Sequence, residues 1–155
     1  AAALCQRVSK LTDGKFEITP FAGGEIVGGT QVLDAVQSNT VECGHTLSSF
    51  YFGKSPVYAI DSGLAFGPNS RQQAAWVYEA GGMALLREFY GRQGLVNFLC
   101  GNTGVQMGGW FRNEINTVAD LQGLKMRIGG FAGSIMERLG VVPQQIAGGE
   151  IYSAL

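Results

Sequence analysis

The side chains best suited to nucleophilic or metal-based catalysis are scarce in this chain, which has one histidine and three cysteines. His45 lies two residues after Cys43, but no nearby residue is placed to orient its imidazole as a general base. The cysteines have no metal-ligand spacing, and three thiols cannot all pair within one chain; a bridge between Cys43 and Cys100 stays open. The nucleophile elbow, the P-loop and the zinc-protease motif are also absent. The residues favour recognition over catalysis.

A recognition chemistry is suggested by Arg127, which lies on the short strand predicted at residues 125–128, just before Gly129-Gly130 and a predicted helix. A guanidinium group presents parallel N–H donors that match the two oxygens of a carboxylate. Arg127 is therefore a candidate carboxylate ligand, with a surface ion pair as the alternative.

Two further segments offer groups that could bind a small ligand. Gln106 lies among glycines and offers a neutral amide oxygen, although an edge glutamine with no ligand would look the same. Phe50 and Tyr51 lie in an irregular aromatic segment, where apolar walls and a phenol hydroxyl could line a pocket. Core packing is the alternative for these two residues.

The elements that must position these residues alternate between helices and strands. Apolar spacing predicts helices at residues 1–13, 30–39, 70–94 and 131–139, the third with a break at Gly81-Gly82 and a Ser70/Gln73 capping box. Alternating or continuous apolar runs predict strands at residues 15–20, 40–46, 95–100, 125–128 and 141–146. Thr117 and Asp120 predict a capped short helix that ends at Gly123. The alternation predicts an α/β fold.

Composition excludes several classes of protein. The 155 residues are 46% hydrophobic and 15% charged, which is apolar enough for a buried core and too poor in charge for a disordered segment. The formal net charge of −1 leaves no basic surplus for nucleic acid, and no run is long and apolar enough to span a membrane. The chain starts with a helical pattern and stops as another helix begins, so it is expected to be a fragment.

Three longer runs together resemble one family. They are Gly101-Asn-Thr-Gly-Val-Gln106-Met-Gly-Gly-Trp110, Asp120-Leu-Gln-Gly-Leu-Lys-Met-Arg127, and Val141-Val-Pro-Gln-Gln-Ile146. The first half carries Pro20-Phe-Ala-Gly-Gly-Glu25 and Arg71-Gln-Gln-Ala-Ala-Trp76. The chain resembles the DctP family of solute-binding proteins of tripartite ATP-independent periplasmic (TRAP) transporters. Within that family it is most similar to the branch that binds 2-oxo acids such as pyruvate.

The resemblance implies an α/β, periplasmic-binding-protein-like clamshell of two lobes, present here only in part. Residues 1–104 would form the first lobe without its opening strand. Residues 105–155 would form a hinge strand and the truncated start of the second lobe. Such proteins close over a ligand by a hinge motion.

The resemblance also assigns roles to the candidate residues. Arg127 matches the arginine that pairs with the substrate carboxylate, and Gln106 matches a residue that gives an amide oxygen to a sodium ion. Phe50 and Tyr51 fall where the first lobe touches the ligand. The remaining sodium ligands would lie beyond Leu155. No cofactor is implied, and sodium would be a co-ligand.

The function implied is non-catalytic capture of a small 2-oxo monocarboxylate in the periplasm and its delivery to a TRAP membrane permease. Two alternatives stay open, a fragment of an α/β enzyme that acts on a carboxylate and a sensor domain of the same fold. The sequence does not decide the oligomeric state, for which a homodimer is one candidate, nor which 2-oxo acid is bound. Nucleic acid is not an expected partner.

Overall fold

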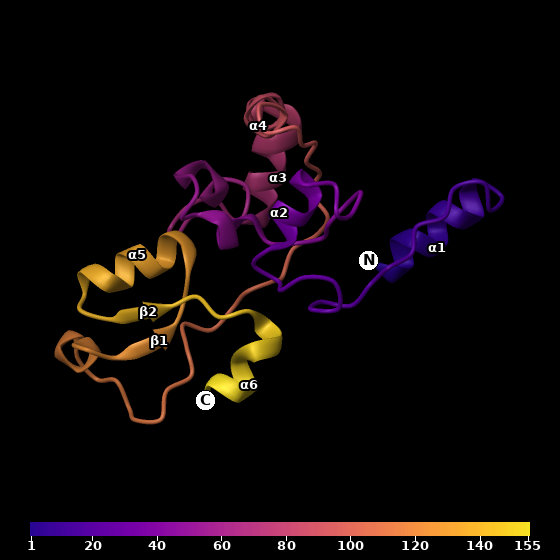
Figure 1. Ribbon diagram of the computed structural model, residues 1–155. Coiled ribbons are helices and arrows are strands. Elements are labelled where there is room, and N and C mark those ends of the chain that lie inside the picture. Colours follow the sequence, from indigo (N-terminus) through magenta and orange to yellow (C-terminus); the bar gives the residue numbers. More distant parts are fainter. The chain divides into compact units, whose positions relative to one another are not determined.

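Two groups of secondary-structure elements make up the computed structural model, which describes all residues from 1 to 155 (Figure 1). The first unit joins Ala1–Thr46 to Ala147–Leu155, and the second is Leu47–Ile146. The first contains α1 (Ala2–Leu11), α2 (Val32–Gln37), a 3₁₀ turn at Gly148–Glu150 and α6 (Ile151–Ala154). The second contains 3₁₀ helices η1 (Ser48–Tyr51), η2 (Pro56–Ala59) and η3 (Val118–Leu121), helices α3 (Ser70–Glu79), α4 (Gly82–Gly91) and α5 (Gly130–Arg138), and strands β1 (Lys125–Arg127) and β2 (Val142–Gln144). None of the helices combines the length and the apolar character that crossing a bilayer requires.

The first helix forms where its apolar spacing predicts, but the predicted stripe does not face a core. Leu4 and Leu11 are 59% and 84% exposed, and the buried residue of α1 is Cys5. In α2, by contrast, Leu33 and Ala35 are buried. The apolar periodicity of α1 therefore predicts the helix correctly, but its apolar stripe is not buried against another element.

Helices α3 and α4 are separated at the predicted glycines. Gly81 has a φ of +84°, a left-handed conformation that a side chain disfavours, so the helix stops and restarts there. The capping box was predicted one residue too late. The N-cap is Asn69, whose carboxamide oxygen accepts from the backbone N–H of Gln72 at 3.0 Å, while the Gln72 side chain accepts from the N–H of Asn69 at 2.9 Å. Asparagine is among the best N-cap residues, which explains the shift.

Aromatic rings form the core that supports η1 and η2. Tyr58 is 1% exposed and makes edge-to-face contacts with Tyr51, Phe89 and Tyr90, at centroid distances of 5.7, 5.1 and 5.7 Å. Its hydroxyl donates to the side-chain oxygen of Gln93. Such pairs stabilise beyond the area they bury. They attach α4 to the short helices that precede it.

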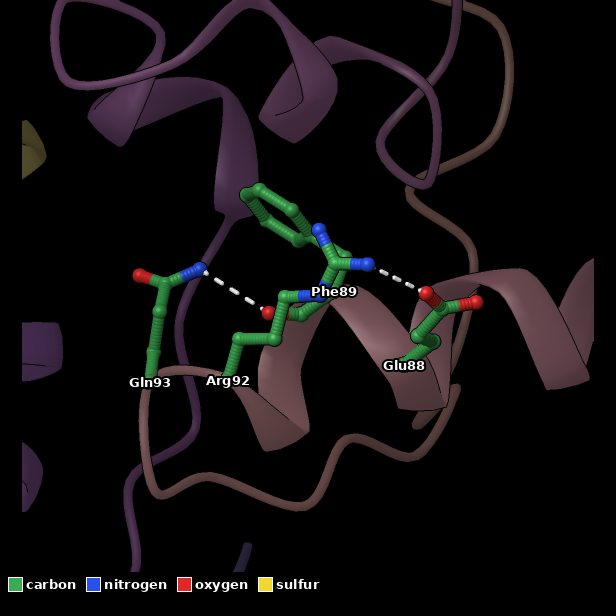
Figure 2. Close-up of polar contacts among 4 residues, drawn as sticks. All are labelled: Glu88, Phe89, Arg92 and Gln93. Carbon is green, nitrogen blue, oxygen red and sulfur yellow. Dashed lines mark hydrogen bonds and ion pairs between the residues drawn. The ribbon is translucent and has the colours of Figure 1, made fainter.

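The end of α4 is fixed by polar contacts. Figure 2 shows the Gln93 amide donating to the backbone carbonyl of Phe89, at 3.3 Å, and Arg92 paired with Glu88 one turn earlier. Gln93 thus occupies a carbonyl of the last helical turn with its nitrogen and the Tyr58 hydroxyl with its oxygen. The exposed Arg92–Glu88 pair adds little stability. The two hydrogen bonds of Gln93 are therefore the contacts that fix the end of α4 against Tyr58.

The C-terminal part of the second unit is a small β-α-β layer. Strands β1 and β2 are parallel, with Arg127 opposite Gln144, and α5 connects them (Figure 1). Leu121, Met126 and Val141 form its buried centre. The predicted box at η3 is confirmed, since the Asp120 carboxylate accepts from the N–H groups of Thr117 and Asn116. These bonds, that from Thr117 first, hold the pKa of Asp120 below its ordinary value.

Three of the predicted strands, at residues 15–20, 40–46 and 95–100, are wrong. The one sheet in the structure has two strands, β1 and β2, and these segments pair with neither. Alternating apolar residues make a segment suited to a sheet, but the strand forms only when a neighbour supplies the backbone hydrogen bonds. The strands predicted at residues 125–128 and 141–146 have each other as partners and do form.

Candidate functional site

A polar cavity of about 390 Å³ lies within the second unit. One wall is the segment that carries η1 and η2, another is the first turn of α5, and a third is the glycine-rich stretch around residue 104. The lining side chains include two serines, a threonine and two amides: Ser49, Ser62, Thr103, Asn102 and Gln106. The volume suits a small ligand, and the oxygen-rich lining suits a polar one.

The third wall contains Gln106, the residue predicted to offer an amide oxygen. Its side-chain nitrogen donates to the hydroxyl of Thr103 at 2.9 Å. Asn102 in turn accepts from the backbone N–H of Gly104 at 2.7 Å, and Gly104 has a φ of +75°, so the loop is turned tightly back on itself. Because the amide nitrogen is used within the loop, the amide oxygen of Gln106 remains as an acceptor for a ligand.

Arg127 ends β1 and is not among the residues that line the cavity. Its Nε donates to the carbonyl of Ile146 at 3.0 Å, and its side chain is otherwise exposed. Nη1 and Nη2 make no hydrogen bond within the protein, so they are available to an external acceptor. Gly129, two residues further on, does line the cavity.

Phe50 and Tyr51, the aromatic pair predicted to line a pocket, are packed against the protein interior. Tyr51 is 2% exposed and packs against the Tyr58 ring, and Phe50 is half-buried. Neither side chain lines the cavity, whereas their neighbour Ser49 does. The backbone carbonyl of Phe50 accepts a hydrogen bond from the Gln145 side chain at 2.6 Å.

A half-buried acid, Asp61, lies directly before the cavity residue Ser62. The Oδ2 atom of Asp61 accepts from the Tyr90 hydroxyl at 2.7 Å, while Oδ1 is buried with no hydrogen bond. Burial raises the pKa of Asp61 above its ordinary value of 3.8, and the hydroxyls of Ser48 and Tyr90 oppose that shift. Burial also raises the pKa of Tyr90, and the Asp61 carboxylate adds to this. Tyr90 therefore remains a neutral donor.

The arrangement suits a hard cation held together with an anionic ligand. Hard cations prefer oxygen, and the lining supplies amide and hydroxyl oxygens. The chain has no cluster of three histidine, cysteine or acidic side chains that could hold a metal ion, and all three cysteines are free. Neutral oxygens leave the charge of a cation uncompensated, so an anionic ligand in the same cavity would complete the site. The first turn of α5 adds unpaired backbone N–H groups, which favour an anion.

Several cavity residues were missed by the sequence reasoning. Asn102 and Thr103 belong to the run that contains Gln106, so their polarity next to two glycines was an available signal. Ser62 and Phe131 carry no local signal, because they reach the cavity only through packing between distant segments.

Comparison with known proteins gives a match along the whole chain. Residues 1–155 match the DctP family, described as bacterial extracellular solute-binding protein, family 7. The chain is 55% identical over all 155 residues to the monocarboxylate 2-oxoacid-binding periplasmic protein of Nostoc sp. PCC 7120. It covers 43% of that relative's length.

Solved structures agree with this match. A TRAP transporter solute-binding protein from Bordetella bronchiseptica RB50, with copurified calcium and picolinate, is 56% identical with a TM-score of 0.96. A TRAP periplasmic solute-binding protein from Pseudoalteromonas atlantica T6c, with bound sodium and pyruvate, is 41% identical with a TM-score of 0.93. The matches cover 99% and 98% of this chain and 46% of each of those chains. The chain thus has part of the two-lobed fold of these proteins.

Proposed function

The chain belongs to bacterial extracellular solute-binding protein family 7, and we propose that it is part of a periplasmic receptor for a small 2-oxo monocarboxylate such as pyruvate. The family consists of solute receptors and not of enzymes. The observation that carries the proposal is the 55% identity, over every residue of the chain, to a 2-oxoacid-binding protein. The chain spans less than half the length of the relatives it matches, so the ligand and partners proposed are those of the full-length protein.

We propose that Arg127 binds the ligand carboxylate. Its Nε bond to Ile146 fixes the plane of the guanidinium group, which leaves the two terminal nitrogens to form a bidentate pair. Helix α5 begins three residues later; its N-cap Gly129 and, from its first turn, Phe131 and Ala132 line the cavity. The positive end of this helix supports a carboxylate in the same region.

Gln106 is proposed to give its amide oxygen to a sodium ion. A 2-oxo acid can present a carboxylate oxygen and a keto oxygen to one cation, and its negative charge complements the neutral lining. Sodium- and calcium-bound relatives with pyruvate are known among the matching structures. A bound ion would orient the ligand, while the residues of this chain exclude water and fix the carboxylate.

We propose a hinge near the stretch from Gly101 to Gly109, with the first lobe up to residue 104 and the second from residue 105. Phe50 and Tyr51 would then belong to the ligand-facing side of the first lobe. Phe50 would contribute its backbone carbonyl, which accepts from Gln145, and Tyr51 would contribute its ring, which packs against Tyr58. A TRAP permease is the proposed membrane partner. A homodimer is a further proposal, supported by the dimer described for the Bordetella bronchiseptica relative.

The proposal is tested by titrating the full-length protein with pyruvate, 2-oxobutyrate and propionate. Propionate has the carboxylate and the length of pyruvate but lacks the keto oxygen. Pyruvate should bind at least about ten-fold more tightly, since one charged or ion-mediated contact contributes about 1.5 kcal/mol or more. Equal affinity for pyruvate and propionate, or no binding of either 2-oxo acid, would contradict the proposal.

A further inference from the structure

One hydrogen bond joins η1, in one wall of the cavity, to a distant residue that lies against the Gly129 backbone in another wall. The Gln145 side chain donates from Nε2 to the backbone carbonyl of Phe50 at 2.6 Å, across a separation of 95 residues. Gln145 directly follows β2, and Phe50 lies in η1. Their neighbours Gly129 and Ser49 both line the cavity. The bond therefore lies beside the space where a ligand would be held.

The backbone around this bond is shaped to let the walls approach. A Cβ on Gly129 would lie 2.6 Å from the side-chain oxygen of Gln145, so the glutamine lies directly against the glycine backbone. A Cβ on Gly130 would lie 3.1 Å from the carbonyl oxygen of Ser49. Gly130 also has a φ of +61°, which a side chain disfavours. Two consecutive glycines thus permit η1 and the start of α5 to come within contact distance.

An aromatic contact joins the same walls. The rings of Phe52 and Phe131 have a centroid separation of 6.2 Å and are tilted by 57°. Phe131 lines the cavity. The contact between the walls thus has a polar part, from Gln145, and an apolar part, from the phenylalanines.

We propose that Gln145 is a positioning residue that holds the two walls together and slows ligand escape. This rests on the proposed function, because Phe50 and Gln145 fall in different proposed lobes. The amide does not touch the ligand; it closes the gap between η1 and β2. Its loss therefore raises the dissociation rate and leaves the association rate nearly unchanged, as is usual when an interaction formed after encounter is removed.

The test compares Gln145→Met with Gln144→Met in the full-length protein. Both variants replace an exposed amide with an uncharged side chain of similar size, so neither adds a charge near Arg127, which lies opposite Gln144; only the first removes the donor to Phe50. Pyruvate association and dissociation rates are measured by stopped-flow fluorescence, and thermal unfolding checks that both variants are folded. We expect dissociation to become roughly three- to ten-fold faster in Gln145→Met and to change less than two-fold in Gln144→Met. Equal dissociation rates in the two variants would overturn the proposal.

Amide hydrogen exchange without ligand separates this inference from the proposed function. Gln145→Met should speed exchange in η1 and in the first turn of α5, and Gln144→Met should not. If the wild-type protein fails to bind pyruvate, the proposed function is wrong and the exchange result alone decides the role of Gln145. Unchanged exchange in both segments would then reject it.

Discussion

Replacement of Arg127 tests the carboxylate ligand directly. The structure already assigns its Nε to the Ile146 carbonyl, so the ligand contact would use only Nη1 and Nη2. A hydrogen bond to a charged group contributes about 1.5–3 kcal/mol. Loss of both in Arg127→Ala should therefore reduce the binding free energy by about 3–5 kcal/mol, which corresponds to a dissociation constant roughly 100- to 4000-fold higher.

Arg127→Lys separates geometry from charge. Lysine keeps the positive charge but cannot form the planar pair or retain the Nε bond to Ile146. Its affinity should be lower by about 1.5–3 kcal/mol, or roughly 10- to 150-fold. The assay is isothermal titration of the full-length variants with pyruvate.

Arg138→Ala is the matched control, because Arg138 is an exposed arginine in the last turn of α5. It should bind within a factor of about two of the wild type, since an exposed charge outside the site is screened by salt. An Arg127→Ala variant that binds pyruvate within a factor of about five of the wild type would refute the anchoring role. Equal losses of pyruvate affinity in Arg127→Ala and Arg138→Ala would show that Arg127 contributes only through its net charge and not as a specific ligand.

Three further predictions concern the walls and the loop of the cavity. Gly130→Ala should lower the free energy of unfolding by about 1–3 kcal/mol in chemical denaturation, because Gly130 has a positive φ and lies against the Ser49 carbonyl. The control Gly53→Ala, with open space around the glycine, should change that free energy by less than about 0.5 kcal/mol. Similar values for the two variants would contradict the packing described. Burial raises the pKa of Asp61 in the folded state above the 3.8 of the unfolded state, so the wild type loses stability as pH rises from 3.8 through the folded pKa. Asp61→Asn has no such group, so its free energy of unfolding should rise relative to that of the wild type over the same pH range. A difference between the two that does not vary with pH would contradict this. Thr103→Val removes the acceptor for the Gln106 amide and should weaken pyruvate binding by about 0.5–1.5 kcal/mol, measured by titration; unchanged affinity would show that the hydroxyl does not orient the amide.

Local signals predicted those elements whose stabilising contacts are local. The break at Gly81 and the Thr117/Asp120 box each depend on residues within one turn, and both are present. The capping box at α3 was displaced by one residue because Asn69 is as good a cap as Ser70.

Elements that depend on distant partners could not be predicted in this way. The segments at residues 15–20 and 95–100 have strand-like apolar residues but no neighbouring strand, so their pattern alone was insufficient. The same holds for the site. The glycine-rich surroundings of Gln106 made it a candidate, and it does line the cavity, whereas Ser62 and the Gln145 bond to Phe50 arise only when segments far apart in sequence pack together.

If this chain forms part of a receptor in which Gln106 helps a cation to bind a 2-oxo acid, pyruvate binding must depend on sodium. Isothermal titration of pyruvate into the full-length protein and its Gln106→Ala variant, in sodium and in potassium buffer, measures this dependence. The wild type should bind more tightly in sodium, and Gln106→Ala should largely lose that preference. Equal wild-type affinity in the two buffers, or a preference for sodium that persists undiminished in Gln106→Ala, would rule out the cation-binding role of Gln106.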